Sequence, residues 1–358
     1  MSTKHQVFVA MSGGVDSALT AAILKDRGYR VTGIHMSTWK DPEWVARTRD
    51  QPAQGALAEE VADTLGIPFI NLDVKAQFYQ DVVQNFIRQY LAGNTPNPCL
   101  FCNPQVKWGI LQSYALDQGA DYFATGHYAR IERLESGPVR LLRGSDPTKD
   151  QSYVLSMLSQ TQLSNTLLPL GGLTKREVRA QAKDLKLPVA DRQDSQDLCF
   201  LGDVNYRDFL NRFAPESSKP GEVVDLAGTR LGEHQGLAFY TIGQRKGIRI
   251  SAPEPYYVVR KDIENNRLVV GFNHQADQCS LDAVGVNWIA GSSPKTDEVY
   301  DVMVRYRARP EKAQLISASE EKFRLKFKKA LHGITPGQVA VLYQGDECLG
   351  GGTIQSAG

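Results

Sequence analysis

A glycine-rich hexapeptide near the start of the sequence constrains the fold more than any other feature. Residues 12–17, with the sequence SGGVDS, follow an apolar run at 7–10 and precede a helical pattern that ends near Gly28. Glycines let the backbone approach a phosphate, and free N–H groups at a helix start favour an anion. The hexapeptide lacks the Lys-Ser/Thr pair of a Walker A loop and the spacing of a Rossmann fingerprint. It therefore predicts another kind of phosphate loop, between a strand and a helix.

Strand and helix signals alternate through residues 1–130. The predicted strands after the loop are 31–36, 69–72 and 122–125, and the predicted helices are 57–65, 78–91 and 106–116. This alternation predicts an α/β fold, a doubly wound parallel sheet with helices on both faces. Ligands bind such sheets at the carboxyl ends of the strands.

The pattern changes near residue 205. Residues 219–250 are rich in glycine and lack helical periodicity. Short alternating runs follow at 284–289, 300–305, 323–327 and 339–343, split by Gly, Pro and Asp. They predict a small antiparallel barrel or sandwich. We predict three domains, at 1–205, 206–278 and 279–358.

The overall charge is nearly balanced. The 358 residues include 41 basic and 40 acidic side chains. Binding of nucleic acid would therefore require local basic patches. Arg305, Arg307 and Arg309 alternate and would share one face of a strand, and residues 244–249 form a second basic segment. No apolar run approaches the roughly 20 residues of a membrane span, and no signal or transit peptide is visible. We expect a cytoplasmic protein with no membrane partner, and we favour a monomer.

Five cysteines lie at positions 99, 102, 199, 279 and 348. An odd number in a chain of this size indicates reduced thiols rather than a disulfide scaffold. Cys99 and Cys102 form a Cys-x-x-Cys pair in a predicted loop between helices. Alone, the pair fits a redox site, half of a zinc site or two ligands of an iron–sulfur cluster. Cys279 and Cys348 are predicted to be small buried hydrophobic residues.

Further motifs extend through the chain. They are TPNPxxxCN at 95–103, ATGHYAR at 124–130, KDQSY at 149–153, DSQDLCFLG at 194–202, GEHQGLAFYTIGQRKGI at 232–248, and PGQVAVLY with CLGGGTI at 336–354. With SGGVDS, the signature of PP-loop ATP pyrophosphatases, they resemble the tRNA-specific 2-thiouridylase family in that family's order. The family makes 2-thiouridine at the wobble position of tRNA. The resemblance implies a PP-loop domain, a small central domain and a C-terminal β-barrel.

The resemblance also implies an ATP site. The loop would hold the leaving pyrophosphate, and two strand ends would border the adenine. Asp16 is a candidate ligand for Mg²⁺. The ATP-binding residues implied are Ala10, Met11, Ser12, Gly13, Gly14, Val15, Asp16, Ser17, Met36 and Gly126.

Sulfur chemistry is implied at two cysteines. Cys199 would carry a persulfide received from a donor protein, and Cys102 would attack it or resolve it into a Cys102–Cys199 disulfide. Because the thiolate is the nucleophile, both thiols are expected to have depressed pKa values, with Lys107 or Arg192 as candidate nearby cations. The residues implied to line the target base are Asn97, Pro98 and Cys99. Those implied to contact tRNA are His127, Lys149, Asp150, Gln151, Arg305, Tyr306 and Gln338.

One position departs from the family pattern. Many members carry Asp where this chain has Cys99. Cys99, Cys102 and Cys199 together form a possible ligand set for a [4Fe-4S] cluster with one open iron for exogenous sulfide. Persulfide relay and cluster chemistry both stay open, as does the role of Cys99.

The implied reaction uses ATP and Mg²⁺. The wobble uridine O2 would be adenylated, and sulfur would then replace it at C2, giving 2-thiouridine, AMP and pyrophosphate. One alternative is a PP-loop amidating or ligating enzyme in which Cys99 and Cys102 are structural. A non-enzymatic alternative is an RNA-binding or iron–sulfur carrier module with a vestigial loop.

Overall fold

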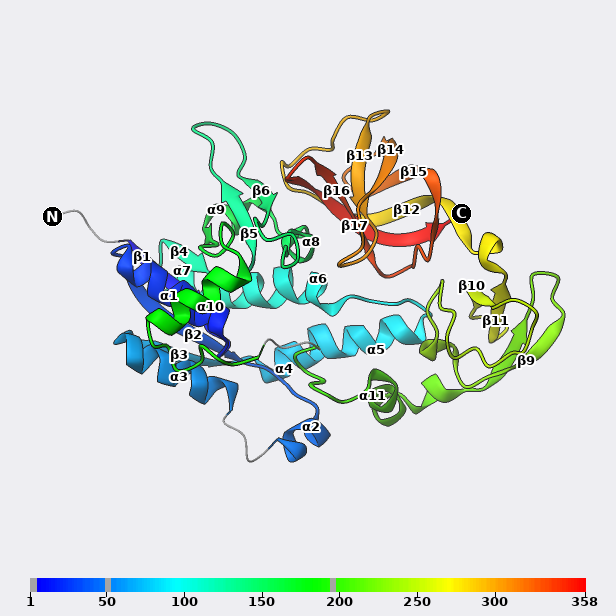
Figure 1. Ribbon diagram of the computed structural model, residues 1–358, viewed down its shortest axis with the longest axis horizontal. Helices are drawn as coiled ribbons and strands as arrows, with labels where there is room; N and C mark the ends of the chain where they lie inside the picture. Colours follow the sequence, from blue (N-terminus) through cyan, green and yellow to red (C-terminus); the bar gives the residue numbers. More distant parts are fainter. Residues whose placement is uncertain (1–4, 49–52, 194–197) are drawn as a thin grey trace.

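The structure is a computed structural model that describes residues 5–48, 53–193 and 198–358. Figure 1 shows a layered α/β region, a small central sheet and a C-terminal barrel. The motif at 194–202 begins with residues 194–197, which lie outside the described residues. Within the described ranges, no helix is both long and apolar enough to cross a membrane.

The α/β region is built on a five-stranded sheet with strand order β3-β2-β1-β4-β7, in which every pairing is parallel. Its strands are β1 (Gln6–Ala10), β2 (Arg30–Ser37), β3 (Phe69–Asp73), β4 (Tyr122–Ala124) and β7 (Thr166–Leu167). The central strand β1 buries Val7, Phe8 and Val9 because helices cover both faces of the sheet. The strand order reverses at β1, between β2 and β4. Ligands bind parallel sheets at the carboxyl edge of such a switch point.

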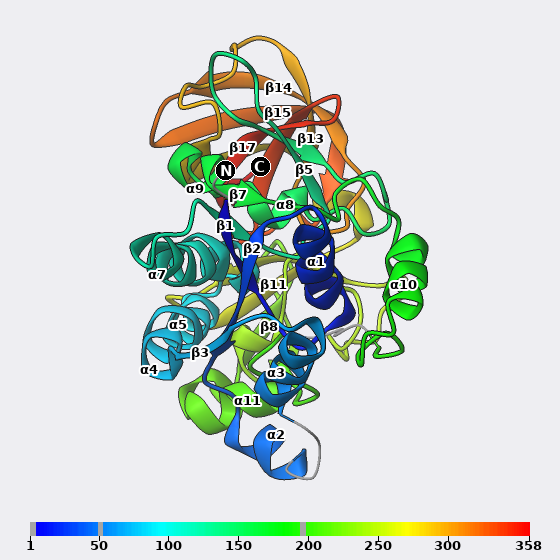
Figure 2. The same cartoon turned by 90° about the vertical axis from the view of Figure 1, so that its left-hand side faces the viewer.

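Side chains of β1 alternate between two cores. Val7 and Val9 pack with α1 (Val15–Asp26), α3 (Gln54–Leu65) and α10 (Lys175–Asp184). Phe8 packs on the other side, against the two long helical runs described next. Figure 2 shows α1, α3 and α10 on one side of the sheet and α4, α5 and α7 on the other. The predicted doubly wound fold is confirmed.

Two helical runs cover the second face, and each contains a π-helical stretch. The first joins α4 (Lys75–Phe78), a π-helical stretch at Tyr79–Val83 and α5 (Gln84–Leu91). The second joins α6 (Pro98–Cys102), a π-helical stretch at Asn103–Gln112 and α7 (Ser113–Asp117). π-helical insertions are frequent at functional sites.

The second run begins at Pro98, so the prediction that Cys99 and Cys102 lie in a loop is wrong. The Asn97 side chain accepts a hydrogen bond of 3.1 Å from the Cys99 backbone N–H. Pro98 occupies the first helical position, where a missing N–H costs nothing. These two residues start a helix that the apolar periodicity alone did not predict.

The central region holds a four-stranded sheet with the order β10-β11-β8-β9. Its strands are β8 (Gly221–Val224), β9 (Arg230–His234), β10 (Tyr257–Asp262) and β11 (Arg267–Gly271). Further α-helices are α2 (Pro42–Arg47), α8 (Ser152–Leu155), α9 (Gln160–Ser164) and α11 (Tyr206–Phe213).

The C-terminal strands form a closed antiparallel barrel in which β12 pairs with β17. They are β12 (Asp277–Trp288), β13 (Val299–Met303), β14 (Glu311–Ala318), β15 (Lys322–His332), β16 (Val339–Gln344) and β17 (Glu347–Ala357). A hairpin of the α/β region, β5 (Ala129–Glu132) and β6 (Arg140–Arg143), extends this sheet because β6 pairs with β17. The predicted barrel is confirmed, and the hairpin joins it to the α/β region.

One expectation about the barrel is wrong. Strand β13 ends at Met303, so Arg305, Arg307 and Arg309 lie in the following turn rather than on one face of a strand. Arg307 has a φ of 62°, which a continuing strand does not allow. The three side chains are exposed all the same.

Candidate active site

A pocket of about 350 Å³ opens at the carboxyl ends of the parallel strands. Its lining brings together the phosphate loop, the ends of β2 and β4, the Cys-x-x-Cys helix and the segment around Cys199. Sequence-predicted residues in this lining are Ala10, Met11, Ser12, Asp16, Ser17, Met36, Pro98, Cys99, Cys102, Gly126, His127, Gln151 and Cys199. The pocket lies at the sheet edge that the strand–helix alternation predicts.

The phosphate loop is held in shape by its own hydrogen bonds. Ser17 Oγ accepts a bond of 3.2 Å from the Ser12 N–H and donates one of 3.0 Å to the Gly14 carbonyl. Arg192 Nη1 donates to the Gly13 carbonyl at 2.5 Å. Gly13 has a φ of 71°, and a Cβ there would lie 2.5 Å from the Gln54 carbonyl oxygen. Gly13, Gly14 and Val15 therefore form the turn that orients the N-terminus of α1 toward the pocket.

Asp16 has cationic and hydroxyl partners. Lys175 Nζ donates to its two oxygens at 2.7 and 2.8 Å, and the Tyr128 hydroxyl donates at 2.7 Å. The end of β4 packs tightly here, because a Cβ on Gly126 would lie 2.8 Å from the Asp16 carbonyl carbon. Asp16 thus faces the pocket as a neutralised ion pair rather than as a free metal ligand.

Lys175 was not predicted as a site residue. It is buried at the start of α10. The sequence does carry a signal for this helix start, since Thr174 and Glu177 form a capping box. Nothing in the sequence indicated that the same helix start packs on Asp16.

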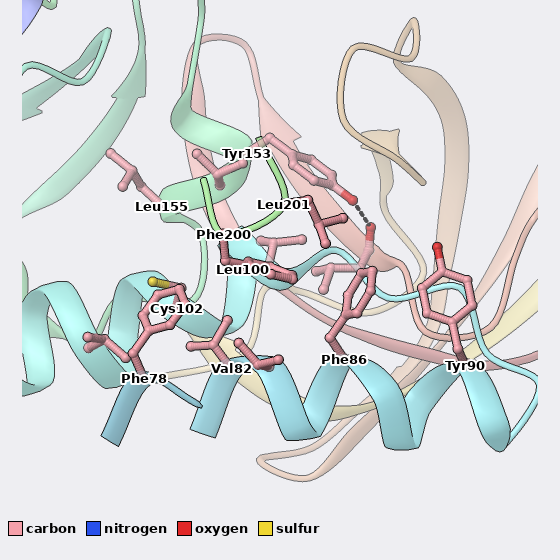
Figure 3. Packing of buried hydrophobic residues seen from close by; sticks show 14 of the residues in the cluster. Phe78, Val82, Phe86, Tyr90, Leu100, Cys102, Tyr153, Leu155, Phe200 and Leu201 are labelled. Carbon is pink, nitrogen blue, oxygen red and sulfur yellow. Dashed lines mark hydrogen bonds between the residues drawn. The ribbon is translucent and has the colours of Figure 1, made fainter. Parts of the chain in front are cut away.

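All three candidate cysteines line the pocket. Cys99 and Cys102 project from α6, and Cys199 comes from a segment far along the chain. Cys99 and Cys199 are exposed to the pocket, whereas Cys102 is 7% exposed. Figure 3 shows Cys102 beside the hydrophobic cluster of Phe78 and Val82.

The expected depression of the thiol pKa values is wrong for this arrangement. Desolvation by the protein atoms around the pocket raises the pKa of the Cys102 thiol to about 12 and that of Cys199 to about 11. It also raises the pKa of Cys99. The Lys107 ammonium lowers the pKa of all three, but by less than desolvation raises it. Cys99 and Cys199 keep contact with the pocket solvent, so Cys102 is the most strongly protonated of the three.

The described residues do not form a metal centre. Within residues 5–48, 53–193 and 198–358, no three His, Cys, Asp or Glu side chains come close enough together to hold a metal ion. Cys99, Cys102 and Cys199 nevertheless share one pocket.

Two of the expected tRNA-contacting residues face the same pocket. His127 Nδ1 lies 2.7 Å from Thr125 Oγ1, and burial followed by the Lys107 charge holds its pKa well below the usual value. Gln151 Oε1 accepts a bond of 3.0 Å from the Tyr128 N–H. His127 is therefore a neutral imidazole at pH 7, and Gln151 is held in place beside it.

The other expected tRNA-contacting residues lie outside the pocket lining. The Asp150 carboxylate accepts bonds from the Gly144 and Ser152 N–H groups at 2.9 and 3.0 Å, so it stabilises the turn that carries Lys149. Arg305 is exposed, and the Tyr306 ring lies 5.9 Å from that of Tyr153.

Asn97 and Gln338 both act on the segment that leads into α6. Asn97 caps that helix, as described above. Gln338 Nε2 donates to the Thr95 carbonyl at 2.6 Å, which ties the barrel to this segment. Both residues therefore fix where Cys99 and Cys102 lie.

Comparisons with known proteins cover nearly the whole chain. Three family models match, described as the tRNA methyl transferase HUP domain over residues 5–203, the tRNA methyl transferase PRC-barrel domain over 207–272 and the Aminomethyltransferase beta-barrel domain over 278–354. The tRNA-specific 2-thiouridylase MnmA of Natranaerobius thermophilus is 42% identical over 366 residues, covering 100% of this chain and 99% of that protein.

Two further relatives carry the same name. MnmA 1 of Caldanaerobacter subterraneus subsp. tengcongensis is 43% identical over 362 residues, covering 99% of both chains. MnmA of Streptococcus sanguinis is 42% identical over 365 residues, covering 99% of this chain and 96% of that protein.

Proposed function

This chain belongs to the tRNA-specific 2-thiouridylase family, and from that premise we propose that it adenylates the wobble uridine of tRNA at O2 and then places sulfur at C2. It is a tRNA sulfurtransferase, and its substrate follows from its full-length relatives. The route through its own residues is the proposal. The products would be 2-thiouridine, AMP and pyrophosphate.

A single observation carries the route. The phosphate loop and three thiols line one pocket, although Ser12 and Cys199 lie far apart in the sequence. An adenylating enzyme with structural cysteines has no need to place those thiols beside the loop. In a shared pocket, adenylation would activate uridine C2 next to the thiols that supply sulfur. The entropic cost of bringing C2 and the sulfur together is then already met by binding.

The adenylation step uses the loop as an anion holder. Uridine O2 attacks the α-phosphate of ATP, the bond to the β-phosphate breaks, and the N3 proton leaves to solvent. N3 takes up a proton again when 2-thiouridine is released. The pyrophosphate that leaves would lie at the N–H groups of residues 12–17, at the start of α1. Met36 and Gly126 would border the adenine, because both line the pocket at strand ends.

We propose that Mg²⁺ enters with ATP. Asp16 is the one carboxylate among the described lining residues, and Lys175 already neutralises it. Magnesium sites of this kind use substrate phosphates and few protein carboxylates. Phosphate oxygens would therefore supply most ligands, and no step here depends on the ion.

Sulfur transfer follows at C2. The terminal sulfur of a Cys199 persulfide, loaded by a persulfide-bearing donor protein, bonds to C2 while the bond to O2 breaks and AMP leaves. The Cys102 sulfur then bonds to Cys199 Sγ, which releases 2-thiouridine and leaves a Cys102–Cys199 disulfide. A thiol reductant returns two electrons for the next cycle.

We favour persulfide relay because Cys102 and Cys199 line one pocket with the phosphate loop, as a pair that can pass sulfur and close a disulfide would. Cys102 is a thiol at neutral pH in the resting pocket, so its attack requires loss of a proton. Anaerobic purification followed by an iron assay tests the cluster alternative. Stoichiometric iron that Cys99→Ser removes would overturn the relay.

One assay tests the function. The protein is incubated with ATP, Mg²⁺, a persulfide donor and unmodified tRNA. The tRNA is then digested, and its nucleosides are analysed by mass spectrometry. We expect a sulfur-for-oxygen mass gain on uridine, with AMP formed in equal amount. A methyl mass gain, or AMP formation that requires ammonia or an amino acid, would contradict the proposal.

A further inference from the structure

The helix that carries the cysteines also places a buried amide in the pocket wall. Cys99, Cys102, Asn103 and Lys107 all line the pocket from the second helical run. Asn103 directly follows Cys102, and its side chain is only 1% exposed. None of the ATP, sulfur or tRNA roles above uses it.

Half of this amide is bonded and half is not. Asn103 Nδ2 donates to the Val154 carbonyl at 2.7 Å, which fixes the orientation because the reversed amide would set two acceptors against each other. Asn103 Oδ1 is buried and has no hydrogen-bond partner in the part of the chain that the structure describes. A buried unpaired acceptor is destabilising, so its place in a pocket wall indicates that a ligand supplies the donor.

The target base offers one donor next to the reacting carbon. Uracil carries N3–H, and N3 is bonded to C2, where sulfur arrives. Cytosine has the same C2 and O2 but carries a lone pair at N3 in place of the hydrogen. An acceptor at this position therefore favours uracil and repels cytosine, although both bases present an O2 that ATP can activate.

Resting on the function proposed above, we propose that Asn103 Oδ1 accepts a hydrogen bond from N3–H of the target uracil and so selects uridine over cytidine. The sequence neighbours Cys102 and Asn103 then serve neighbouring atoms of the base, C2 and N3. Because Oδ1 is screened from water in the resting pocket, the incoming base displaces the side chains that cover it. The bond to Val154 keeps the acceptor in place during this exchange.

The test compares two tRNAs that differ only in uridine or cytidine at the wobble position. The Asn103→Leu variant removes the acceptor and keeps a side chain of similar size. We expect kcat/KM for the uridine tRNA to fall about ten- to a hundredfold, and the residual rate with the cytidine tRNA not to fall. An unchanged rate, or an equal fall on both tRNAs, would overturn the inference.

Gln112→Leu is the matched control. Gln112 lies on the same helical run, is buried, and donates from Nε2 to the Gln162 carbonyl at 2.9 Å, but it lies outside the pocket lining. Its loss removes a similar amide–carbonyl bond, so we expect the uridine-to-cytidine ratio to stay at its unmutated value. If Gln112→Leu changed the uridine-to-cytidine ratio as much as Asn103→Leu does, the effect would come from a general disturbance of the helix, and the inference would be overturned. Failure of the unmutated protein to thiolate uridine would instead overturn the proposed function.

Discussion

At the scale of single residues, position in the fold separates the five cysteines. Cys348 is 1% exposed, which confirms its prediction as a small buried residue. Cys279 is exposed, so the same prediction is wrong for it, because β12 turns it toward solvent. Cys99, Cys102 and Cys199 differ from both in sharing the pocket with the phosphate loop.

Removal of either pocket thiol tests the relay. We expect Cys102→Ser and Cys199→Ser each to reduce 2-thiouridine formation to background, because a hydroxyl neither carries nor resolves a persulfide. The measurement is nucleoside mass spectrometry, with tRNA affinity recorded in parallel. Cys279→Ser is the control and is expected to keep full activity. Retained thiolation in Cys199→Ser would refute the assignment.

Three histidines make stability depend on pH. Burial lowers the pKa of His35, His127 and His234, so the folded protein keeps them neutral below the usual value of 6.5. The unfolded chain takes up protons below about pH 6.5, so stability is full above that value and is lost as the pH falls. His35 and His234 are the most buried, and each contributes at most about 1.4 kcal/mol per pH unit.

The melting temperature is therefore expected to fall between pH 7 and pH 5. Carboxylates such as Asp146 have pKa values lowered by folding, so their contribution to stability is lost only at more acidic pH. They do not change the expected fall between pH 7 and pH 5. Calorimetry at fixed ionic strength is the measurement. A melting temperature that stays constant or rises from pH 7 to pH 5 would contradict the neutral histidines.

At the scale of elements, helix starts and ion pairs decide how the segments around the pocket are held. Asn97 and Pro98 start α6, which turns a predicted loop into a helix that presents two thiols. Asp41 caps α2 and is completely buried. Arg212 of α11 donates to its two oxygens at 3.0 and 2.6 Å, which joins the two helices.

Breaking this ion pair should destabilise the protein. Arg212→Met leaves the Asp41 carboxylate buried without its cation, and we expect a loss of about 2–3 kcal/mol in the free energy of unfolding. Arg212 is itself partly exposed, so we place the loss at or below the low end for buried pairs. Urea denaturation followed by circular dichroism measures it.

Arg324→Met is the matched control for that change. Arg324 also donates to two oxygens of one carboxylate, that of Asp282, at 2.7 and 2.8 Å, but neither of these two side chains is buried. Such a pair contributes less than about 1 kcal/mol. Equal losses in the two variants would show that burial of Asp41 does not govern the effect.

At the scale of the whole molecule, the two later regions hold the segment that leads to the cysteines. Thr95 N–H donates to the Pro336 carbonyl at 2.9 Å, and Thr95 Oγ1 donates to Thr241 Oγ1 at 3.2 Å. Gln338 adds its bond to the Thr95 carbonyl. A contact of tRNA with the barrel or the central sheet would therefore act on the position of α6.

The turn after β13 provides the test at this scale. Arg305, Arg307 and Arg309 are exposed, and the chain as a whole carries a net charge of only +1. We expect Arg305→Gln, Arg307→Gln and Arg309→Gln combined to weaken tRNA binding. The salt dependence of binding should also become shallower, by about 0.7–0.9 in log–log slope for each phosphate that the variant no longer neutralises.

Filter binding across a salt series measures this effect. Lys312→Gln is the control, because Lys312 is already paired with Asp301 at 3.0 Å on the same barrel. An unchanged salt slope in the triple variant would remove this turn from the tRNA surface.

The sequence by itself determined the fold class and the family. Local patterns suffice where the cause is local. Glycines and a helix start make the phosphate loop, apolar runs mark strands of the parallel sheet, and alternating apolar residues mark strands of the barrel. The motif string identified the family because its order along the chain is directly visible. The helix start at Pro98 was also local, but its capping signal lay within a segment without apolar periodicity.

Only the tertiary structure decided how distant segments meet. It placed Lys175 on Asp16, brought Cys199 to the pocket of Cys102, and paired the β5–β6 hairpin with β17. It also reversed the expected thiol pKa shifts, because desolvation depends on every element packed around the sulfur. The unpaired Asn103 oxygen belongs to the same class, since a missing partner is a property of the whole packed neighbourhood and not of the residue's own segment.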